Sequence, residues 1–274
     1  MEFQQLSLRS KDGTIIAYEK AGSGQPIILV SPALADRTGN AGLASVLTRN
    51  LTVINYDRRG RGASTDTLPF AVQREVEDIE ALIESAGGTA YLFGSSSGAA
   101  LALEAASELP GKVRALFMYE PPFIVDGSHA PLPSDYAAHL RSLIADNRRS
   151  EAVDYFMLQA VGIPEGLLRQ MHGDPMWPSL ERAAHTLPYD GELMASMMTG
   201  KPLPAHRWDP VKCPALVMVG GASPDWLHSA AHAISQALPK AKYRELEGRD
   251  HSAVTSAPRD VATTMYGFFL SERI

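Results

Sequence analysis

The sequence predicts an α/β protein with a mostly parallel central sheet, helices on both faces of that sheet and an inserted helical cap. Short, largely apolar runs are typical of strands that are covered on both faces, and they occur at 26–30, 89–93, 113–119 and 215–220. Helical stretches alternate with these runs, which favours parallel strands joined by right-handed crossovers. The alternation stops at about 124 and resumes at about 210. We therefore expect an insertion over that interval.

Each element follows from a local pattern. Two short segments in which apolar and polar residues alternate, 3–9 and 14–20, flank the turn Lys11-Asp12-Gly13. This pattern predicts an antiparallel hairpin. The strands expected after it are 26–30, 51–56, 89–93, 113–119, 215–220 and 242–246. Apolar residues at helical spacing and strand–helix alternation predict helices at 71–85, 97–109, 225–238 and 258–271.

This organisation divides the chain into a core interrupted by a cap. We expect 1–123 and 211–274 to form the two parts of the core domain, and 124–210 to form a helical cap or lid. Ligands of open α/β sheets bind at the carboxyl ends of the strands. A cap inserted there would cover the ligand site.

Composition excludes several classes of function. The chain has 274 residues, is 45% hydrophobic and carries a formal charge of −6, which is typical of an ordinary globular protein. The only arginine cluster lies in a glycine-rich turn at 58–61, so a nucleic-acid partner is not expected. No secretory signal and no apolar run of roughly 20 residues are visible, so we expect a cytoplasmic protein without a membrane partner. Cys213 is the only cysteine, which excludes a disulfide scaffold and cysteine-based metal sites.

Three consecutive serines lie between two glycines at 94–98. The segment Gly94-Ser95-Ser96-Ser97-Gly98 matches the pattern G-x-S-x-G only when it is centred on Ser96. A strand precedes it and an apolar helix follows it, which is the setting of a nucleophile elbow. We therefore predict that Ser96 is a nucleophile and that the Ser97 amide stabilises an oxyanion. The alternative is a flexible Ser/Gly loop that closes a strand–helix junction.

Four stretches in this order resemble the α/β-hydrolase family: IILVSPALAD, VINYDRRGRGAS, LFGSSSGAALAL and LEGRDHSAV. The resemblance implies the α/β-hydrolase fold, Ser96 as nucleophile and His251 as base, in a loop after the last core strand. Among the other seven histidines, His228 and His232 are one helical turn apart, but the sequence offers no third ligand for a metal. We expect neither a metal nor an organic cofactor.

The position of the acid that orients the histidine departs from the common family pattern. Ser223 stands where an Asp normally follows the strand ALVMVGG. Glu120 directly follows the strand 113–119, which is where some haloalkane dehalogenases and the zearalenone-lactone hydrolases carry their acid. This resemblance favours Glu120 as the acid, with Asp225 as the alternative. Asp250 adjoins His251, and adjacent side chains diverge.

The oxyanion hole is a second departure. Many relatives have His-Gly after the first parallel strand, whereas this chain has Ser31-Pro32-Ala33. Pro32 has no amide hydrogen, so the second donor is expected to be the Ala33 N–H, paired with that of Ser97. The Ser31 hydroxyl either adds a donor or ends the strand. Asp57 is expected to hold a structural turn.

The cap offers residues that could contact a substrate. Trp177, Tyr189 and Met194 are expected to line a mostly apolar pocket, although packing within the cap is the alternative for each.

Together these features predict a serine hydrolase that cleaves an ester or lactone of a medium-sized hydrophobic substrate through an acyl-enzyme. The alternatives are perhydrolase, lyase or C–C bond hydrolase chemistry on the same triad, and a non-catalytic small-molecule receptor. The sequence leaves open whether the chain forms a homodimer.

Overall fold

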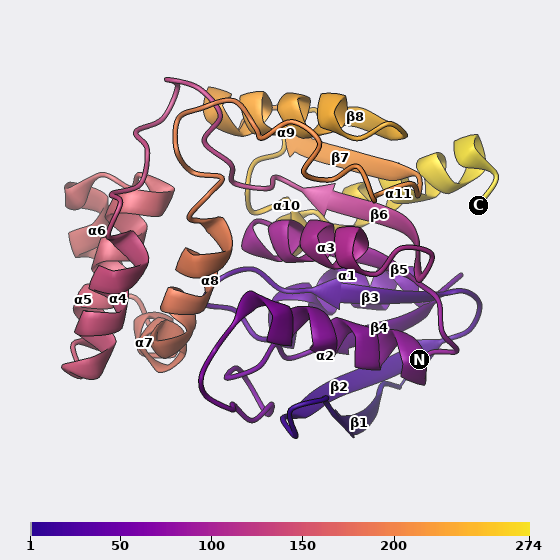
Figure 1. The fold of residues 1–274 in the computed structure, drawn as a ribbon, viewed down its shortest axis with the longest axis horizontal. Helices are drawn as coiled ribbons and strands as arrows, with labels where there is room; N and C mark the ends of the chain where they lie inside the picture. The colour runs from indigo at the N-terminus through magenta and orange to yellow at the C-terminus, as the bar shows by residue number, and fades with distance from the viewer. Residues whose placement is uncertain (1) are drawn as a thin grey trace.

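An eight-stranded sheet forms the centre of the computed structural model, which describes residues 2–274 (Figure 1). Its strand order is β1-β2-β4-β3-β5-β6-β7-β8. The pairs β1–β2 and β2–β4 are antiparallel, and every pair from β4 to β8 is parallel. The strands are β1 Gln4–Arg9, β2 Ile15–Gly22, β3 Pro26–Val30, β4 Thr52–Tyr56, β5 Ala90–Ser95, β6 Val113–Tyr119, β7 Ala215–Gly220 and β8 Ala241–Leu246.

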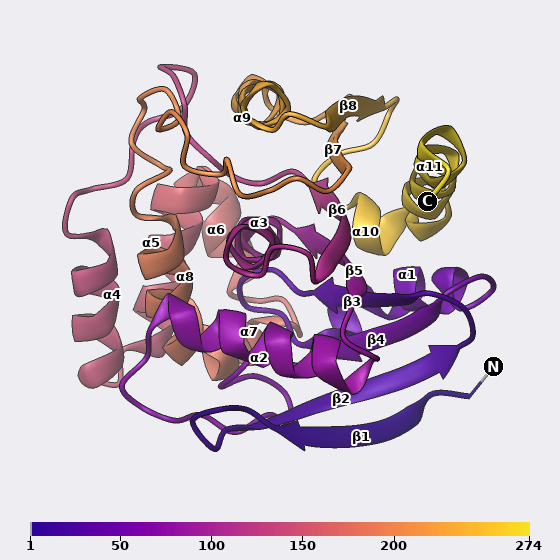
Figure 2. The same cartoon turned by 45° about the vertical axis from the view of Figure 1, so that its right-hand side comes forward.

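Helices cover both faces of the sheet (Figure 2). Alternate residues of a strand point to opposite faces, so in β3 Ile28 joins the core on one face and Ile27 joins the core on the other. This explains why the strand is apolar throughout. On the Ile28 face lie α2 Val72–Ser85, α3 Ser97–Glu108 and α9 Asp225–Ala237, and on the Ile27 face lie α1 Ala41–Leu47, α10 Ala253–Ser256 and α11 Pro258–Glu272.

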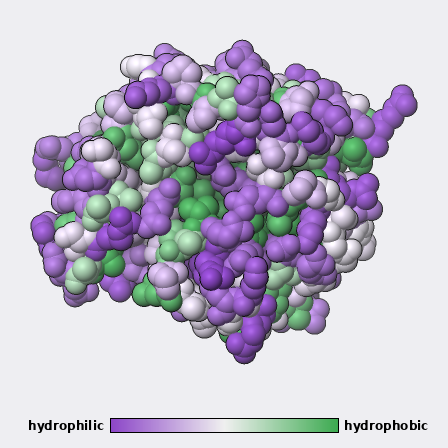
Figure 3. All heavy atoms as spheres, in the orientation of Figure 1, coloured by the Kyte–Doolittle hydropathy of each residue, from purple (hydrophilic) through white to green (hydrophobic). Residues whose placement is uncertain are grey.

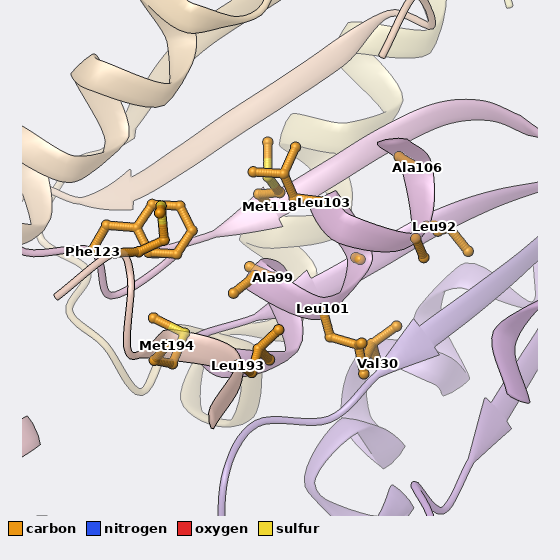
Figure 4. Close-up of a cluster of buried hydrophobic side chains, with 14 of the residues drawn as sticks. Val30, Leu92, Ala99, Leu101, Leu103, Ala106, Met118, Phe123, Leu193 and Met194 are labelled. Atoms are coloured by element: carbon orange, nitrogen blue, oxygen red, sulfur yellow. The ribbon is translucent and has the colours of Figure 1, made fainter. Parts of the chain in front are cut away.

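The segment between β6 and β7 is helical and lies beside the carboxyl ends of the parallel strands (Figure 1). Its last α-helix, α8, packs against α3, and Figure 4 shows Leu193 and Met194 beside Ala99 in a common apolar cluster. The segment contains α4 Tyr136–Ala145, α5 Arg149–Phe156, the π-helix η2 Met157–Val161, α6 Glu165–Met171, α7 Trp177–Ala183, the 3-10 helix η3 Ala184–Thr186 and α8 Leu187–Met194.

The predicted fold class is confirmed, and the expected strands and core helices agree with the structure to within two residues at each end. β5 continues to Ser95 because Gly94 and Ser95 pair with Met118 and Tyr119 of β6. The 3-10 helix η1 at Arg37–Asn40 and the short helices α1 and α10 were not predicted from the sequence. Short helices depend on packing more than on intrinsic propensity. Within residues 2–274, no helix has the length and apolar character that crossing a membrane requires.

Candidate active site

Ser96 occupies a strained turn between β5 and α3. Its backbone has φ +52° and ψ −128°, a conformation that L-residues rarely adopt and that is typical of functional sites. A Cβ at Gly94 would lie 2.2 Å from the Gly98 carbonyl oxygen, and a Cβ at Gly98 would lie 2.4 Å from the Val30 carbonyl oxygen. Both glycines are therefore required sterically, because they let the turn close and let α3 begin directly against the end of β3.

His251 is paired with Glu120. Nδ1 of His251 lies 2.6 Å from Oε2 of Glu120, whose side chain is fully buried, while the imidazole is 48% exposed. The other carboxylate oxygen, Oε1, accepts hydrogen bonds from the Gly220 N–H at 2.6 Å and from the Ser223 hydroxyl at 2.5 Å. Three partners thus satisfy a carboxylate that would be costly to bury alone.

The loop that carries His251 is held in place through Asp250, the residue before the histidine. The Tyr119 hydroxyl donates to the Asp250 carbonyl oxygen at 2.5 Å. Burial, together with the nearby Glu120 charge, raises the pKa of Tyr119, so the phenol keeps its proton for this bond. The Asp250 carboxylate accepts from the hydroxyl and the N–H of Ser252, and these bonds lower its pKa. Asp250 is thus engaged away from the His251 ring.

The structure places the two candidate acids differently. Asp225 is exposed at the first residue of α9, whereas Nδ1 of His251 is bonded to Glu120. Ser223, which stands where the common family pattern has its acid, donates to the carboxylate of Glu120. The sequence alone held no signal for this role, because it depends on the pairing of β7, which Ser223 follows, with β6, the strand directly before Glu120.

The two predicted oxyanion donors belong to residues of one pocket. Ala33 and Ser97 line it together with Ser96 and His251. Ser97 is the first residue of α3, so its N–H has no partner within the helix. The buried Ser31 hydroxyl donates to the Asp36 carbonyl oxygen at 3.1 Å and accepts from Asn40 at 3.1 Å. Ser31 therefore ties down the end of β3, which was one of its two predicted roles.

The pocket is small and largely apolar. Its volume is about 140 Å³, and Figure 3 shows apolar residues among polar ones where α8 meets α3. Besides the residues named above, its walls come from the loop after β6, the helical segment and α9. They include Pro122, Leu132, Tyr136, Phe156, Ala160, Val161, Asp190, Gly191, Met194, Met198, Pro224, Trp226 and Leu227. Within residues 2–274, no group of three or more His, Cys, Asp or Glu side chains is arranged to hold a metal ion.

Of the three cap residues predicted to line this pocket, only Met194 does so. Trp177 and Tyr189 are not among the residues that line it, and both side chains have partners elsewhere. The Trp177 indole N–H donates to Ser150 at 3.1 Å. The Tyr189 hydroxyl donates to Asp66 at 2.6 Å, and its ring stacks on that of Phe70. The tryptophan that does line the pocket, Trp226, comes from α9 and was not predicted.

The arginine-rich turn after β4 has a structural role. Asp57 accepts hydrogen bonds from the N–H groups of Arg37 and Ala63, as expected of a residue that holds a turn. Arg58 and Arg61 are buried and both bind Asp190 on α8. This turn therefore joins the core to the helical segment through buried ion pairs.

Comparison with known proteins agrees with this architecture. A family model described as "Alpha/beta hydrolase family" matches residues 27–264. The crystal structure of an alpha/beta hydrolase from Sphaerobacter thermophilus is 46% identical, with a TM-score of 0.87 over 96% of this chain and 100% of that one.

Two curated relatives are more distant. The "Putative non-heme bromoperoxidase BpoC" of Mycobacterium tuberculosis is 28% identical over 93% of this chain and 98% of its own length. The "Uncharacterized hydrolase YraK" of Bacillus subtilis is 29% identical over 52% of this chain, and that match spans about half of the relative, 53% of its length.

Proposed function

Because the chain belongs to the alpha/beta hydrolase family, we propose that it is a serine hydrolase that cleaves a carboxylic ester or lactone through an acyl-enzyme. The observation that carries the proposal is the pairing of His251 with the buried Glu120 beside the pocket that Ser96 also lines. A nucleophile, a base and a group that orients the base are the three parts that this chemistry needs. The strained backbone of Ser96 supports the same role.

The proposed reaction starts with attack of the Ser96 hydroxyl on the substrate carbonyl. Glu120 accepts the hydrogen bond from Nδ1 of His251, which leaves Nε2 free to take the serine proton. The Ala33 and Ser97 amides donate to the oxyanion of the tetrahedral intermediate. When the C–O bond breaks, His251 returns the proton to the leaving alcohol, and it then activates the water that hydrolyses the acyl-enzyme.

The pocket supports a hydrophobic acyl group of modest size. An apolar cavity of about 150 Å³ in another protein accommodates benzene, and the volume here is about 140 Å³. We therefore propose that the part of the substrate next to the carbonyl has about six carbon atoms inside the pocket. The position of Glu120 after β6 further supports kinship with the zearalenone-lactone hydrolases, and for that reason lactones belong among the first substrates to test.

One comparison favours a second candidate function. The Mycobacterium tuberculosis relative is named as a non-heme bromoperoxidase. The second candidate is therefore a reaction in which hydrogen peroxide, and not water, attacks the acyl-enzyme. That reaction would release a peracid from the same Ser96 acyl group. Hydrolysis of an ester and formation of a peracid, measured side by side with and without hydrogen peroxide, separate the two.

The direct test is the intact mass of the protein after treatment with a fluorophosphonate probe. We expect one adduct on the wild type, no adduct on Ser96→Ala, and an unchanged adduct on Ser95→Ala, the matched control in the neighbouring position. A screen of aryl esters and lactones with the same three proteins then follows. A wild type that forms no adduct and turns over no substrate would overturn the proposal and favour a small-molecule receptor.

A further inference from the structure

Arg61 has contacts that reach from the helical segment to the loop after β3, which contains Pro32 and Ala33. Its side chain is buried, with 1% exposed. One terminal nitrogen donates to the Pro32 carbonyl oxygen at 2.7 Å, and the other donates to Oδ2 of Asp190 at 2.6 Å. The guanidinium thus joins two parts of the chain that are separated by more than a hundred residues.

The Pro32 carbonyl belongs to the same peptide unit as the Ala33 N–H. Among residues 2–274 the only cis peptide bond is Leu68–Pro69, so this peptide is trans and its C=O and N–H point in opposite directions. A donor that holds the carbonyl oxygen of Pro32 on one side therefore holds the Ala33 N–H on the other. Ala33 lines the pocket beside Ser96 and Ser97.

We propose that Arg61 is a positioning residue that orients the Ala33 amide in the oxyanion hole, and that Asp190 of α8 holds Arg61 in place. The inference rests on the proposed function, because it assigns a task to one peptide of that mechanism. It also links the packing of the helical segment to the orientation of the Ala33 amide, because Asp190 can hold Arg61 only when α8 is packed on the core. The helical segment then does more than cover the pocket, since its position sets the direction of a donor to the oxyanion.

The charges around Asp190 are suited to this task. Arg58 donates to its other oxygen at 2.9 Å and also forms two hydrogen bonds with the buried Glu75. Burial opposes ionisation of Asp190, but the charges of Arg58 and Arg61 outweigh it and hold the pKa of Asp190 below its ordinary value. Two buried cations and two buried anions thus alternate in one cluster. Such a cluster has little freedom to rearrange without leaving a charge unpaired.

The same turn contains a matched control. The Arg59 side chain is fully buried and forms ion pairs with Asp78 and Asp12, plus a hydrogen bond to the Arg74 carbonyl oxygen. None of these partners lines the pocket. Arg59 is therefore an arginine of equal burial and similar pairing, two positions away, that forms no hydrogen bond with the loop containing Pro32 and Ala33.

The test compares Arg61→Lys with Arg59→Lys in ester hydrolysis. Lysine keeps the charge but lacks the planar fork that reaches two acceptors at once. Loss of a whole oxyanion donor costs about 10²–10³ in kcat, so a misdirected one should lower kcat about 10–100-fold in Arg61→Lys, with KM within about threefold. The inhibition constant of an aryl boronic acid, which forms a tetrahedral adduct on the serine, should rise by the same factor. Arg59→Lys should change kcat less than about threefold, even where both variants lose similar thermal stability.

A second variant covers the case in which Arg61→Lys does not fold. Asp190→Asn keeps the size of the side chain and should lower kcat in the same direction, with the same weakening of boronic acid binding. A folded Arg61→Lys or Asp190→Asn with wild-type kcat and boronic acid affinity would overturn the inference, as would an equal loss of kcat in Arg59→Lys. A wild type that neither hydrolyses esters nor reacts with the fluorophosphonate would instead reject the proposed function itself.

Discussion

Replacing Glu120 by Gln tests the arrangement of the site most directly. The carboxylate accepts from Gly220 and Ser223 through Oε1, and from His251 through Oε2. A glutamine has only one acceptor oxygen. The Gly220 N–H is a backbone donor that cannot reverse its direction, so the amide oxygen should take the place of Oε1. The amide NH₂ then takes the place of Oε2 and faces His251.

This reversal has a defined chemical consequence. An NH₂ group facing Nδ1 makes that nitrogen an acceptor and moves the ring proton to Nε2. His251 can then no longer take the proton of Ser96. In the Ser-His-Asp triad of a serine protease, the corresponding Asp→Asn change keeps the geometry and lowers kcat by about 10⁴ for this reason. We expect the same order for Glu120→Gln, which corresponds to a barrier increase of roughly 5 kcal/mol at 1.36 kcal/mol per factor of ten.

The assay is steady-state hydrolysis of the best ester from the screen, with circular dichroism to show that the variant is folded. Asp225→Asn is the matched control, because it removes the charge of the exposed alternative acid, and we expect its kcat to stay within about twofold of wild type. A folded Glu120→Gln that keeps more than about a tenth of the wild-type kcat would refute the reasoning. So would a loss in Asp225→Asn comparable with that in Glu120→Gln.

Four further predictions follow from other contacts. Ser223→Ala removes one hydrogen bond to a charged group, worth at least about 1.5 kcal/mol if fully expressed in the transition state, so kcat/KM should fall about 10-fold in the same assay. Gly98→Ala places a Cβ 2.4 Å from a backbone oxygen and should lower the free energy of unfolding in urea by about 1–3 kcal/mol; an unchanged midpoint would contradict this. Met194→Trp should fill part of the pocket and lower kcat/KM for hexanoyl esters much more than for acetyl esters. Burial opposes ionisation of Asp12, but the Arg59 ion pair outweighs it and holds the pKa of Asp12 below its ordinary value of 3.8. The resulting stability is therefore present above pH 3.8 and lost as the pH falls further, and Asp12→Asn should show a smaller loss in urea titrations between pH 7 and pH 3.

Much of this protein is determined by short stretches of its sequence. Strand runs that are apolar throughout require two covered faces, and the alternation with helices requires parallel pairing. The elbow at Ser96 is likewise local, because its glycines, strand and helix are consecutive. For these features a few neighbouring residues contain the whole physical cause, so the fold class and Ser96 as the residue at the turn could both be predicted.

Other features were decided only when distant segments packed together. Glu120 and His251 are 131 positions apart, and the sequence left Asp225 open as a partner for the same ring. The support that Ser223 gives to Glu120 depends on β6 and β7 being neighbours.

The pocket wall was the least predictable part. A tryptophan in the helical segment between β6 and β7 and another at the start of α9 are equally apolar, and only packing places Trp226 at the pocket and turns Trp177 toward Ser150. Likewise, nothing local to the turn after β4 reveals that Arg61 meets both Pro32 and Asp190. Local sequence determines backbone conformation and apolar faces, whereas the partner of a buried polar group depends on which distant group arrives to satisfy it.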